Sequence, residues 1–161
     1  MPQFSAPQPD NAYLVDHIRL VRYSFQHHIG QDFPLTNTEM QSDEAIAEAI
    51  FKAPFMVVSH NTEADPIFNY ANQVALELFE MTWDEFTILP SRKSAEPPNR
   101  EERSRLLHTV TTQGYIKHYS GIRISKTGRR FRIKDATVWN LISNDGTYRG
   151  QAASSSQWNY V

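Results

Sequence analysis

Hydrophobic residues in the first third of the chain recur at helical spacing. Leu14, Ile18, Val21 and Phe25 are separated by four, three and four positions, so they line one side of a helix over about residues 11–28. Gly30 is expected to end this helix, because glycine adopts the left-handed conformation of a helix C-terminus without strain. A single apolar stripe on an otherwise polar helix predicts that the helix packs against another surface.

The next segment predicts a second helix followed by a strand. Thr38 and Gln41 have the spacing of a capping box, in which two side chains bond free backbone N–H groups at a helix start. Pro54 cannot continue a helix, so the helix is expected to end before it. The short apolar run Phe55–Ser59 then has the length and composition of a buried strand.

Between residues 66 and 86 a strand passes directly into two short helices. Ile67–Tyr70 is a run of strand-forming residues, and the side chain of Asn72 is suited to capping the helix that follows. Apolar residues at helical spacing over 74–79 predict that helix. Thr82 and Glu85 form another capping box, which opens a second short helix carrying Trp83.

The C-terminal part predicts one long helix and three strands. Asn99 is expected to cap the helix and Gly114 to end it, and strands are expected at about 115–125, 130–143 and 147–157. In the middle strand the apolar residues change from odd to even positions, which predicts a β-bulge near Lys134 or Asp135. The buried side of the helix is expected to carry Arg103, Leu106, Leu107 and Val110.

Four further segments match a known family in the same order along the chain. They are LPSRKSAEP (Leu89–Pro97), YSGIRISKTGRRFRI (Tyr119–Ile133), VWNL (Val138–Leu141) and GQAA (Gly150–Ala153). Together they resemble the MEKHLA domain, a family related to PAS domains that is found in bacteria and at the C-terminus of plant class III homeodomain–leucine zipper proteins. The similarity extends over about residues 12–158.

The resemblance and the element order imply one architecture. It is an α+β, PAS-like fold with a five-stranded antiparallel sheet, helices on one side and an N-terminal helical extension. A first strand in the centre of the sheet would decide for this fold. Residues 1–10 are expected to be disordered, 11–52 to form the N-terminal helices and 53–161 the PAS-like domain. The resemblance implies a sensory or interaction module that brings no catalytic residues and signals through another protein.

Composition excludes several classes of function. The chain has 161 residues and no cysteine, so disulfides, thiolate metal sites and cysteine nucleophiles are excluded. The N-terminus lacks the features of a secretory signal, and no apolar run has the roughly 20 residues of a membrane span. A cytoplasmic protein with no membrane partner is therefore expected.

Charge is unevenly distributed along the chain. Residues 1–90 hold 3 basic and 13 acidic side chains and residues 91–161 hold 13 and 5, so the two parts carry −10 and +8. The two parts are expected to neutralise one another largely in the fold; docking on a charged partner is the alternative. The basic segment Arg123–Lys134 is interpreted as a solvated strand face, and no nucleic-acid partner is expected at a sequence pI of about 6.3.

No cofactor is predicted. Flavin photochemistry of the LOV type requires a cysteine that the chain lacks, so only a flavin held without a covalent bond is left open, with Gln151 as the residue that would face it. Haem-binding PAS domains use a histidine on the helix before the last strands. His108 occupies that helix, but at ~100° per residue it lies opposite the buried face, so haem is not expected.

A cavity between the sheet and the helices is the expected site for a small apolar or aromatic molecule. Alternation along the strand places His118 on the face of Ile122, which adds a polar group to the cavity wall. One alternative is that these side chains simply fill a close-packed core. For His118 the alternatives are that core partners satisfy it or that strand twist displaces it outward. The predicted lining residues are Phe55, Val57, Phe68, Tyr70, Leu76, Phe79, Phe86, Leu107, His118, Ile122 and Trp139.

An enzyme is the competing hypothesis. Helices followed by a curved sheet also describe the cone-shaped folds of the NTF2 and ketosteroid isomerase type, in which an Asp or His in an apolar pocket transfers a proton. Asp135 and His118 would be the candidates here. A non-catalytic module is favoured, because two strands precede the helix cluster and no nucleophile–base spacing, phosphate loop or metal motif is present.

The stripe on the N-terminal helix leaves two alternatives for what covers it. Leu14, Ile18, Val21 and Phe25 pack either across the sheet of their own chain or against a second copy. In the second alternative these four residues form a homodimer interface, and exchange of Ile18 and Val21 for glutamate would convert a dimer to a monomer. The sequence identifies neither the small molecule nor the signalling partner.

Overall fold

The computed structural model describes residues 4–35 and 41–161 of the chain. Residues 1–3 and 36–40 are outside the described part, and they include Thr38 of the first predicted capping box. The second helix, α2 (Asp43–Phe51), instead has Ser42 as its N-cap, whose hydroxyl accepts a hydrogen bond from the Ala45 N–H at 3.1 Å. Among the described helices, none is both long and apolar enough to cross a membrane.

The N-terminal part begins with a 3-10 segment and a long helix. The 3-10 segment η1 (Pro9–Leu14) leads into α1 (Val15–Ile29). The helix starts later than residue 11 because Ala12, Tyr13 and Leu14 have φ values between 53° and 58°, which are incompatible with a right-handed helix. Gly30 ends α1 with φ of 80°, as predicted.

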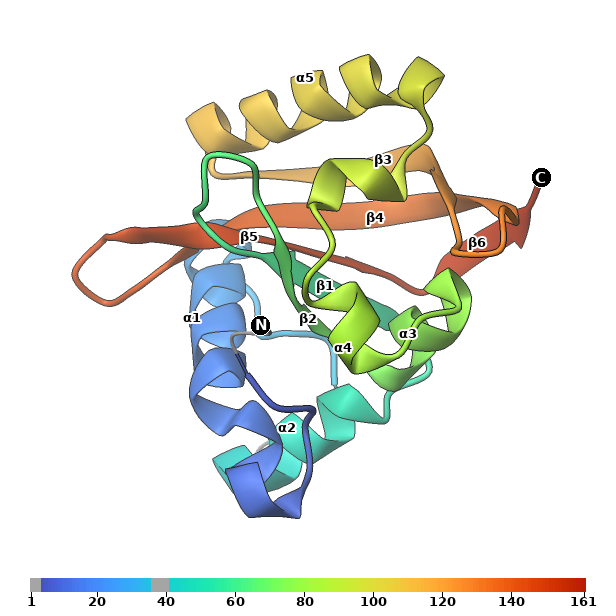
Figure 1. Cartoon of the computed structure of the whole chain (residues 1–161). Coiled ribbons are helices and arrows are strands. Elements are labelled where there is room, and N and C mark those ends of the chain that lie inside the picture. The colour runs from blue at the N-terminus through green and yellow to red at the C-terminus, as the bar shows by residue number, and fades with distance from the viewer. Residues whose placement is uncertain (1–3, 36–40) are drawn as a thin grey trace.

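Five strands form an antiparallel sheet in the order β2-β1-β5-β4-β3 (Figure 1). They are β1 (Met56–His60), β2 (Phe68–Ala71), β3 (Tyr115–Ile124), β4 (Arg130–Ile142) and β5 (Tyr148–Ser155). The first strand lies inside the sheet between β2 and β5, which is the arrangement expected for a PAS-like fold.

Two bulges face each other across β3 and β4. Gly121 pairs with Ile133 but Tyr119 pairs with Ala136, so β4 has an extra residue at the position predicted near Asp135. A second extra residue lies in β3 at His118. Both bulged residues have positive φ, 50° for Asp135 and 58° for His118.

The strand predicted over 147–157 is in fact two strands. β6 (Gln157–Tyr160) follows β5 and pairs with the first half of β4. The break lies opposite the bulge in β4, where the Ser155 hydroxyl donates to the Lys134 carbonyl oxygen at 2.6 Å. The bulge interrupts the ladder, and so it divides its partner strand as well.

Four helical segments connect β2 to β3: α3 (Gln73–Phe79), α4 (Trp83–Phe86), the 3-10 turn η3 (Ser91–Ser94) and α5 (Pro97–Gln113). Asn72 caps α3 and the Thr82–Glu85 capping box opens α4, as predicted. The predicted cap at Asn99 is wrong. Helix α5 already begins at Pro97, a residue favoured in the first turn because its fixed φ suits a helix and its missing N–H needs no partner.

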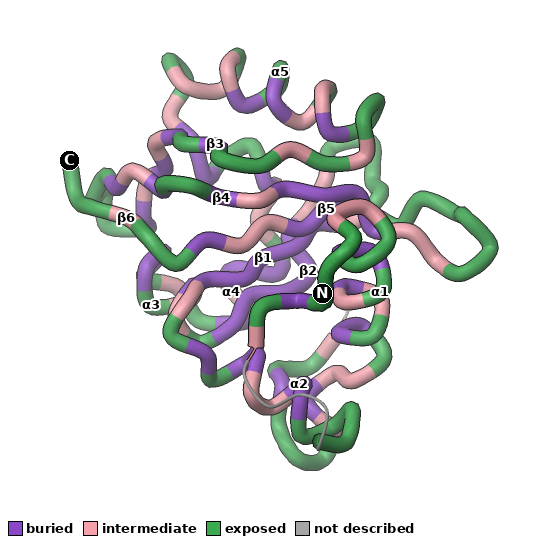
Figure 2. The backbone as a smooth tube through the Cα atoms, turned by 180° about the vertical axis from the view of Figure 1, so that it is seen from behind, coloured by how far each residue is buried: buried purple, intermediate pink, exposed green. Residues whose placement is uncertain are grey.

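The sheet has a hydrophobic core on each face. Val57, Trp139 and Leu141 pack with α1 and α2, whereas Val58 and Val138 pack with α3 and α5. In Figure 1, α1 and α2 lie below the strands and α5 lies above them. Figure 2 shows that much of the central strands is buried between these layers.

Two ion pairs of the described residues join the oppositely charged parts of the chain. Lys126 pairs with Glu85, and Arg92 Nε lies 3.1 Å from Asp65 Oδ1. These pairs join basic residues of the second part to acidic residues of the first. The two parts interleave in the fold, as expected, because β1 of the first part pairs with β5 of the second.

Candidate functional site

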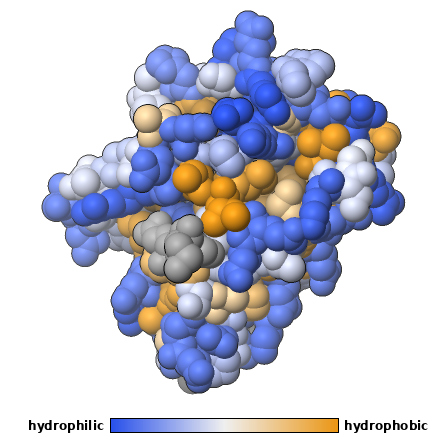
Figure 3. Space-filling view, in the orientation of Figure 1, coloured by the Kyte–Doolittle hydropathy of each residue, from blue (hydrophilic) through white to orange (hydrophobic). Residues whose placement is uncertain are grey.

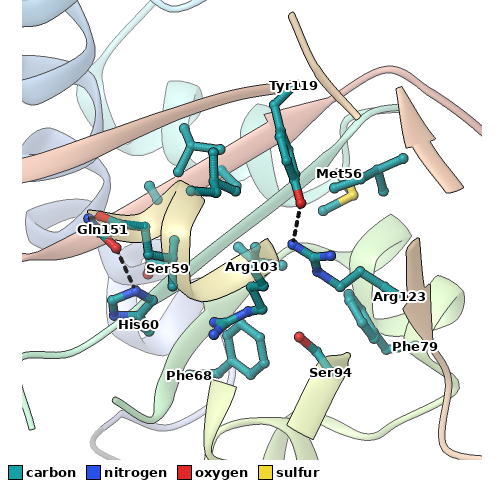
Figure 4. Close-up of a pocket in the computed structure, with 17 residues that line it drawn as sticks. Met56, Ser59, His60, Phe68, Phe79, Ser94, Arg103, Tyr119, Arg123 and Gln151 are labelled. Carbon is teal, nitrogen blue, oxygen red and sulfur yellow. Dashed lines mark hydrogen bonds between the residues drawn. The ribbon is translucent and has the colours of Figure 1, made fainter. Parts of the chain in front are cut away.

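A cavity of about 60 Å³ lies between α5 and the sheet (Figure 4). This volume accommodates roughly four to six water-sized groups. The polar residues of its wall are Ser59, His60, Ser94, Arg103, Tyr119, Arg123 and Gln151. The apolar residues are Met56, Val58, Phe68, Phe79, Leu106, Leu107, Ile133, Val138, Ala152 and Ala153.

Two buried arginines lie in the wall of this cavity. Arg103 comes from α5 and Arg123 from β3, and each residue is only 8% exposed. The Arg103 guanidinium donates to the Ser91 hydroxyl at 2.8 Å. The Arg123 guanidinium donates to the Ile122 carbonyl oxygen at 2.8 Å and to the Tyr119 hydroxyl at 3.2 Å.

Gly121 makes room for this arrangement on β3. Tyr119, Gly121 and Arg123 share the cavity face of the strand, and a Cβ on Gly121 would lie 2.2 Å from the Tyr119 hydroxyl oxygen. Glycine therefore allows the tyrosine to lie along the strand and reach Arg123. The Tyr119 hydroxyl in turn donates to Glu102 of α5 at 3.2 Å, which ties the helix to the strand.

Burial lowers the pKa of Arg103. Desolvation, with a smaller contribution from the positive charge of Arg123, lowers the pKa of Arg103 to about 10. At neutral pH the Arg103 guanidinium is still charged. The cavity therefore has a strongly positive region in an otherwise largely apolar wall.

A second polar group, on the other side of the cavity, is satisfied by protein partners. Figure 4 shows His60 beside Gln151, with Arg103 between this pair and Arg123. His60 Nε2 lies 3.1 Å from Gln151 Oε1, and Gln151 Nε2 donates to the Leu107 carbonyl oxygen, Thr111 Oγ1 and Asn140 Oδ1 at 3.0–3.2 Å. Burial lowers the pKa of His60 below its usual value. This pair fixes the end of β5 against α5.

Three of the eleven predicted lining residues line the cavity: Phe68, Phe79 and Leu107. Phe86 lies behind this wall, stacked on Phe68 with ring centroids 4.1 Å apart. The others do not contribute to the wall, and for most of them the physical reason is strand alternation, since neighbouring strand residues point to opposite faces. Val57, Tyr70 and Trp139 are buried in the core on the other face, where Phe55 and Leu76 also pack.

The prediction that His118 and Ile122 face the cavity is wrong. They share a face of β3, as expected, but Tyr119 and Arg123 on the opposite face line the cavity instead. The His118 side chain is 81% exposed, and its Nδ1 hydrogen-bonds Asp135 Oδ1. The two residues proposed for an enzyme therefore pair outside the cavity, not in an apolar pocket.

The stripe on α1 packs on the sheet of its own chain. Ile18, Val21 and Phe25 are at most 7% exposed, and Leu14 packs against the same core. The Trp139 indole N–H donates to the Val21 carbonyl oxygen at 3.3 Å across this contact. Of the two predicted alternatives the structure has the first, so this intramolecular contact takes the place of the predicted dimer interface.

The cavity does not fit a flavin or a haem. Cavities for ligands of that size measure about 300–1,000 Å³, whereas this one measures about 60 Å³. Gln151, the residue considered for a flavin, already bonds four protein groups, and His108 on α5 is exposed. Within residues 4–35 and 41–161, no three His, Asp or Glu side chains are grouped to hold a metal ion.

The main residues that sequence reasoning missed are Arg123 and Tyr119. Arg123 was grouped with the basic segment that follows it, where Lys126 and Arg130 do pair with glutamates on the surface. The signal that distinguishes it is its spacing, since Arg123 lies two residues from Gly121 and four from Tyr119 on one strand face. Arg103 was correctly placed on the buried side of its helix.

The comparison that decides the family covers nearly the whole chain. Residues 15–160 match the MEKHLA domain. The chain belongs to the MEKHLA domain family. A related protein is the homeobox-leucine zipper protein HOX32 of Oryza sativa subsp. japonica, 24% identical over 143 residues. That alignment covers 89% of this chain but only 16% of the relative, so this MEKHLA domain corresponds to a small part of the longer protein.

Solved structures show that the MEKHLA domain has a PAS-like fold. A PAS domain of a protein from Colwellia psychrerythraea superimposes with a TM-score of 0.61 at 14% identity, covering 73% of this chain and 95% of that one. A light-oxygen-voltage domain, solved in a study of a flavin analogue, gives a TM-score of 0.57 at 16% identity over 73% and 84%. At these identities the likeness concerns the fold alone.

Proposed function

We propose that this MEKHLA domain is a non-catalytic sensory module that binds a small molecule in the cavity under α5 and signals through a protein partner. The observation that carries the proposal is a cavity with an apolar wall and a few convergent polar groups, which is the usual composition of a small-molecule site. The cavity lies between sheet and helices, where PAS-like folds leave room for a ligand. The expected place of action is the cytoplasm.

The volume restricts what this module senses. About 60 Å³ suits a compound of roughly four to six non-hydrogen atoms, far smaller than a flavin or a haem. Helix α5 covers the cavity and is polar on its outer side, as the hydrophilic atoms at the top of Figure 3 show. A bound molecule would contact α5 and β3 together. Binding would therefore change the position of α5, whose outer surface is available to a partner.

A substitution that fills the cavity tests the proposal. Ala153 lines the cavity from β5, and Ala153→Leu extends a larger side chain into it, whereas Ser154→Leu adds the same bulk on the opposite face of the strand. Melting temperatures would be measured with a panel of small acids, amides, alcohols and amines. We expect at least one class to stabilise the natural chain and Ser154→Leu but not Ala153→Leu. A panel that stabilises all three proteins equally, or none, would contradict a ligand site here.

A further inference from the structure

We propose that the cavity binds a short-chain monocarboxylate, with its carboxylate held by Arg103 and Arg123 and its hydrocarbon tail against the apolar wall under α5. This inference rests on the proposed function and adds the chemical class of the ligand. The observation behind it is a pair of buried positive charges beside an apolar space.

Within residues 4–35 and 41–161, neither buried arginine forms an ion pair, and Asp65, whose charge acts on Arg103, is itself paired with Arg92. Buried charges are normally paired, because taking an ion out of water is costly unless an opposite charge replaces the solvent. In the part of the chain that the structure describes, the ion pairs of Arg92 and Arg130 lie at the surface, and none involves Arg103 or Arg123. Glu102 reaches Arg123 only through the Tyr119 hydroxyl. A bound anion would supply the missing charge.

Both arginines also have hydrogen-bond donors to spare. A guanidinium carries five N–H groups in a planar fork that matches a carboxylate. One hydrogen bond from the Arg103 side chain and two from that of Arg123 are made to protein atoms. Among the residues that the structure describes, neither arginine has a buried nitrogen without a hydrogen-bond partner, so each guanidinium nitrogen either bonds a protein atom or is accessible to a small molecule.

The rest of the wall defines the tail of the ligand. Met56, Val58, Phe79, Ile133 and Val138 surround the space next to the arginines with aliphatic and aromatic groups. A second charge on the ligand would be desolvated against these groups, which excludes a dicarboxylate. The volume limits the acid to about two to four carbons, which with the two carboxylate oxygens make roughly four to six non-hydrogen atoms. A small acid such as propionate meets all three conditions.

Calorimetric titration with propionate and with propionamide tests the charge requirement in the natural chain. The two compounds have the same shape and differ in charge, and sodium gluconate sets the ionic strength because chloride is small enough to compete. We expect propionate to bind at least about tenfold more tightly, since hydrogen bonds to charged groups are the stronger ones. Equal or preferred binding of propionamide would overturn the inference while leaving the proposed function intact.

Inorganic phosphate is the third ligand in this titration. It carries the charge but has no hydrocarbon tail, so we expect it to bind more weakly than propionate. Tighter binding of phosphate would overturn the monocarboxylate assignment and show a general anion site. If no small compound binds at all and Ala153→Leu changes nothing, the proposed function fails together with the inference.

Substitution of Arg103 separates a ligand role from a structural one. Arg103→Gln is expected to weaken propionate binding at least about tenfold, whereas Arg105→Gln, on the exposed side of the same helix, leaves it unchanged.

A second variant tests the structural role of the same residue. Arg103→Met removes an unpaired buried charge, so its melting temperature without anions is expected to equal or exceed that of the natural chain. In the natural chain, propionate at a hundred times its dissociation constant should raise the melting temperature by about 5 °C or more, and this rise should be absent in Arg103→Met. A lower melting temperature with this rise intact would overturn the inference.

Discussion

Single buried polar residues stabilise this fold through local hydrogen bonds. The Asn72 side chain, fully buried, accepts from the N–H groups of Val57 and Ala75 and donates to the carbonyl oxygens of Ile50 and Phe55, all at 2.7–3.2 Å. One asparagine thereby joins β1, α2 and α3. The sequence predicted its role as a helix cap, but not the three contacts to distant residues, because those depend on tertiary packing.

His17 is buried on the other face of the sheet. Its Nε2 lies 2.9 Å from the Ser59 hydroxyl, which in turn donates to Asn69 Oδ1, and its ring stacks on Tyr70 at 5.6 Å. Burial lowers the pKa of His17 to about 4, because the charged imidazolium would lose its hydration there. The side chain is therefore neutral in the folded protein over most of the physiological range.

This histidine is expected to make stability depend on pH. Its pKa is about 4 in the folded chain and 6.5 in the unfolded one, so the unfolded chain binds more protons between these values. The contribution of neutral His17 is complete above pH 6.5 and is lost as the pH falls toward 4. The loss amounts to about 3 kcal/mol of unfolding free energy.

Urea unfolding at pH 7 and pH 4 checks this expectation. His17→Gln should lose less stability between the two pH values than the natural chain does, by about that amount. His108→Gln, at an exposed position of α5, serves as the control and should behave as the natural chain. An unchanged pH dependence in His17→Gln would contradict a lowered pKa of His17 in the folded chain.

At the scale of single elements, helix and strand types were predictable and several boundaries were not. The Gly30 stop, the Thr82–Glu85 capping box and the bulge near Asp135 depend on local chemistry, and all three are present. The delayed start of α1 and the division of the last strand depend on other parts of the chain. The break between β5 and β6 at Ser156 has no glycine or proline in the local sequence. The bulge in the opposing strand β4 causes this break.

Helix α1 is expected to stabilise its own chain. Ile18 is 1% exposed in the core against the sheet, so Ile18→Ala should lower the unfolding free energy by about 2–5 kcal/mol. Tyr23→Ala, at a position 40% exposed on the same helix, is the control and should have a small effect. Denaturant unfolding and light scattering would be measured together. A lower molar mass for Ile18→Ala at unchanged stability would show that the stripe meets a second copy after all.

At the scale of the whole molecule, the order of strands was predictable and the assignment of faces was not. A shift of one residue moves a strand side chain to the other face of the sheet. Val57 and Trp139 were therefore assigned to the cavity although they pack under α1. Helical periodicity is more robust, and it correctly placed Arg103 and Leu106 on the buried side of α5.

The two faces of the sheet differ in what covers them. The cavity lies under α5, while α1 and α2 cover the opposite face of the same sheet. Strands β1 and β5 contribute to both faces. Ser59 of β1 lines the cavity and hydrogen-bonds His17 of α1, and Ala152 of β5 lines the cavity and belongs to the core beneath α1. The N-terminal helices are thus an integral layer of the fold.

The side-chain NMR signals of the arginines test the ligand site most directly. In a ¹H–¹⁵N spectrum each arginine Nε–H gives its own signal, and the Arg103→Gln and Arg123→Gln variants assign the two that matter. During titration with propionate we expect these two signals to shift together and to saturate, while that of exposed Arg105 stays in place. Shifts spread over the surface arginines, with Arg103 and Arg123 unmoved, would contradict a carboxylate site under α5.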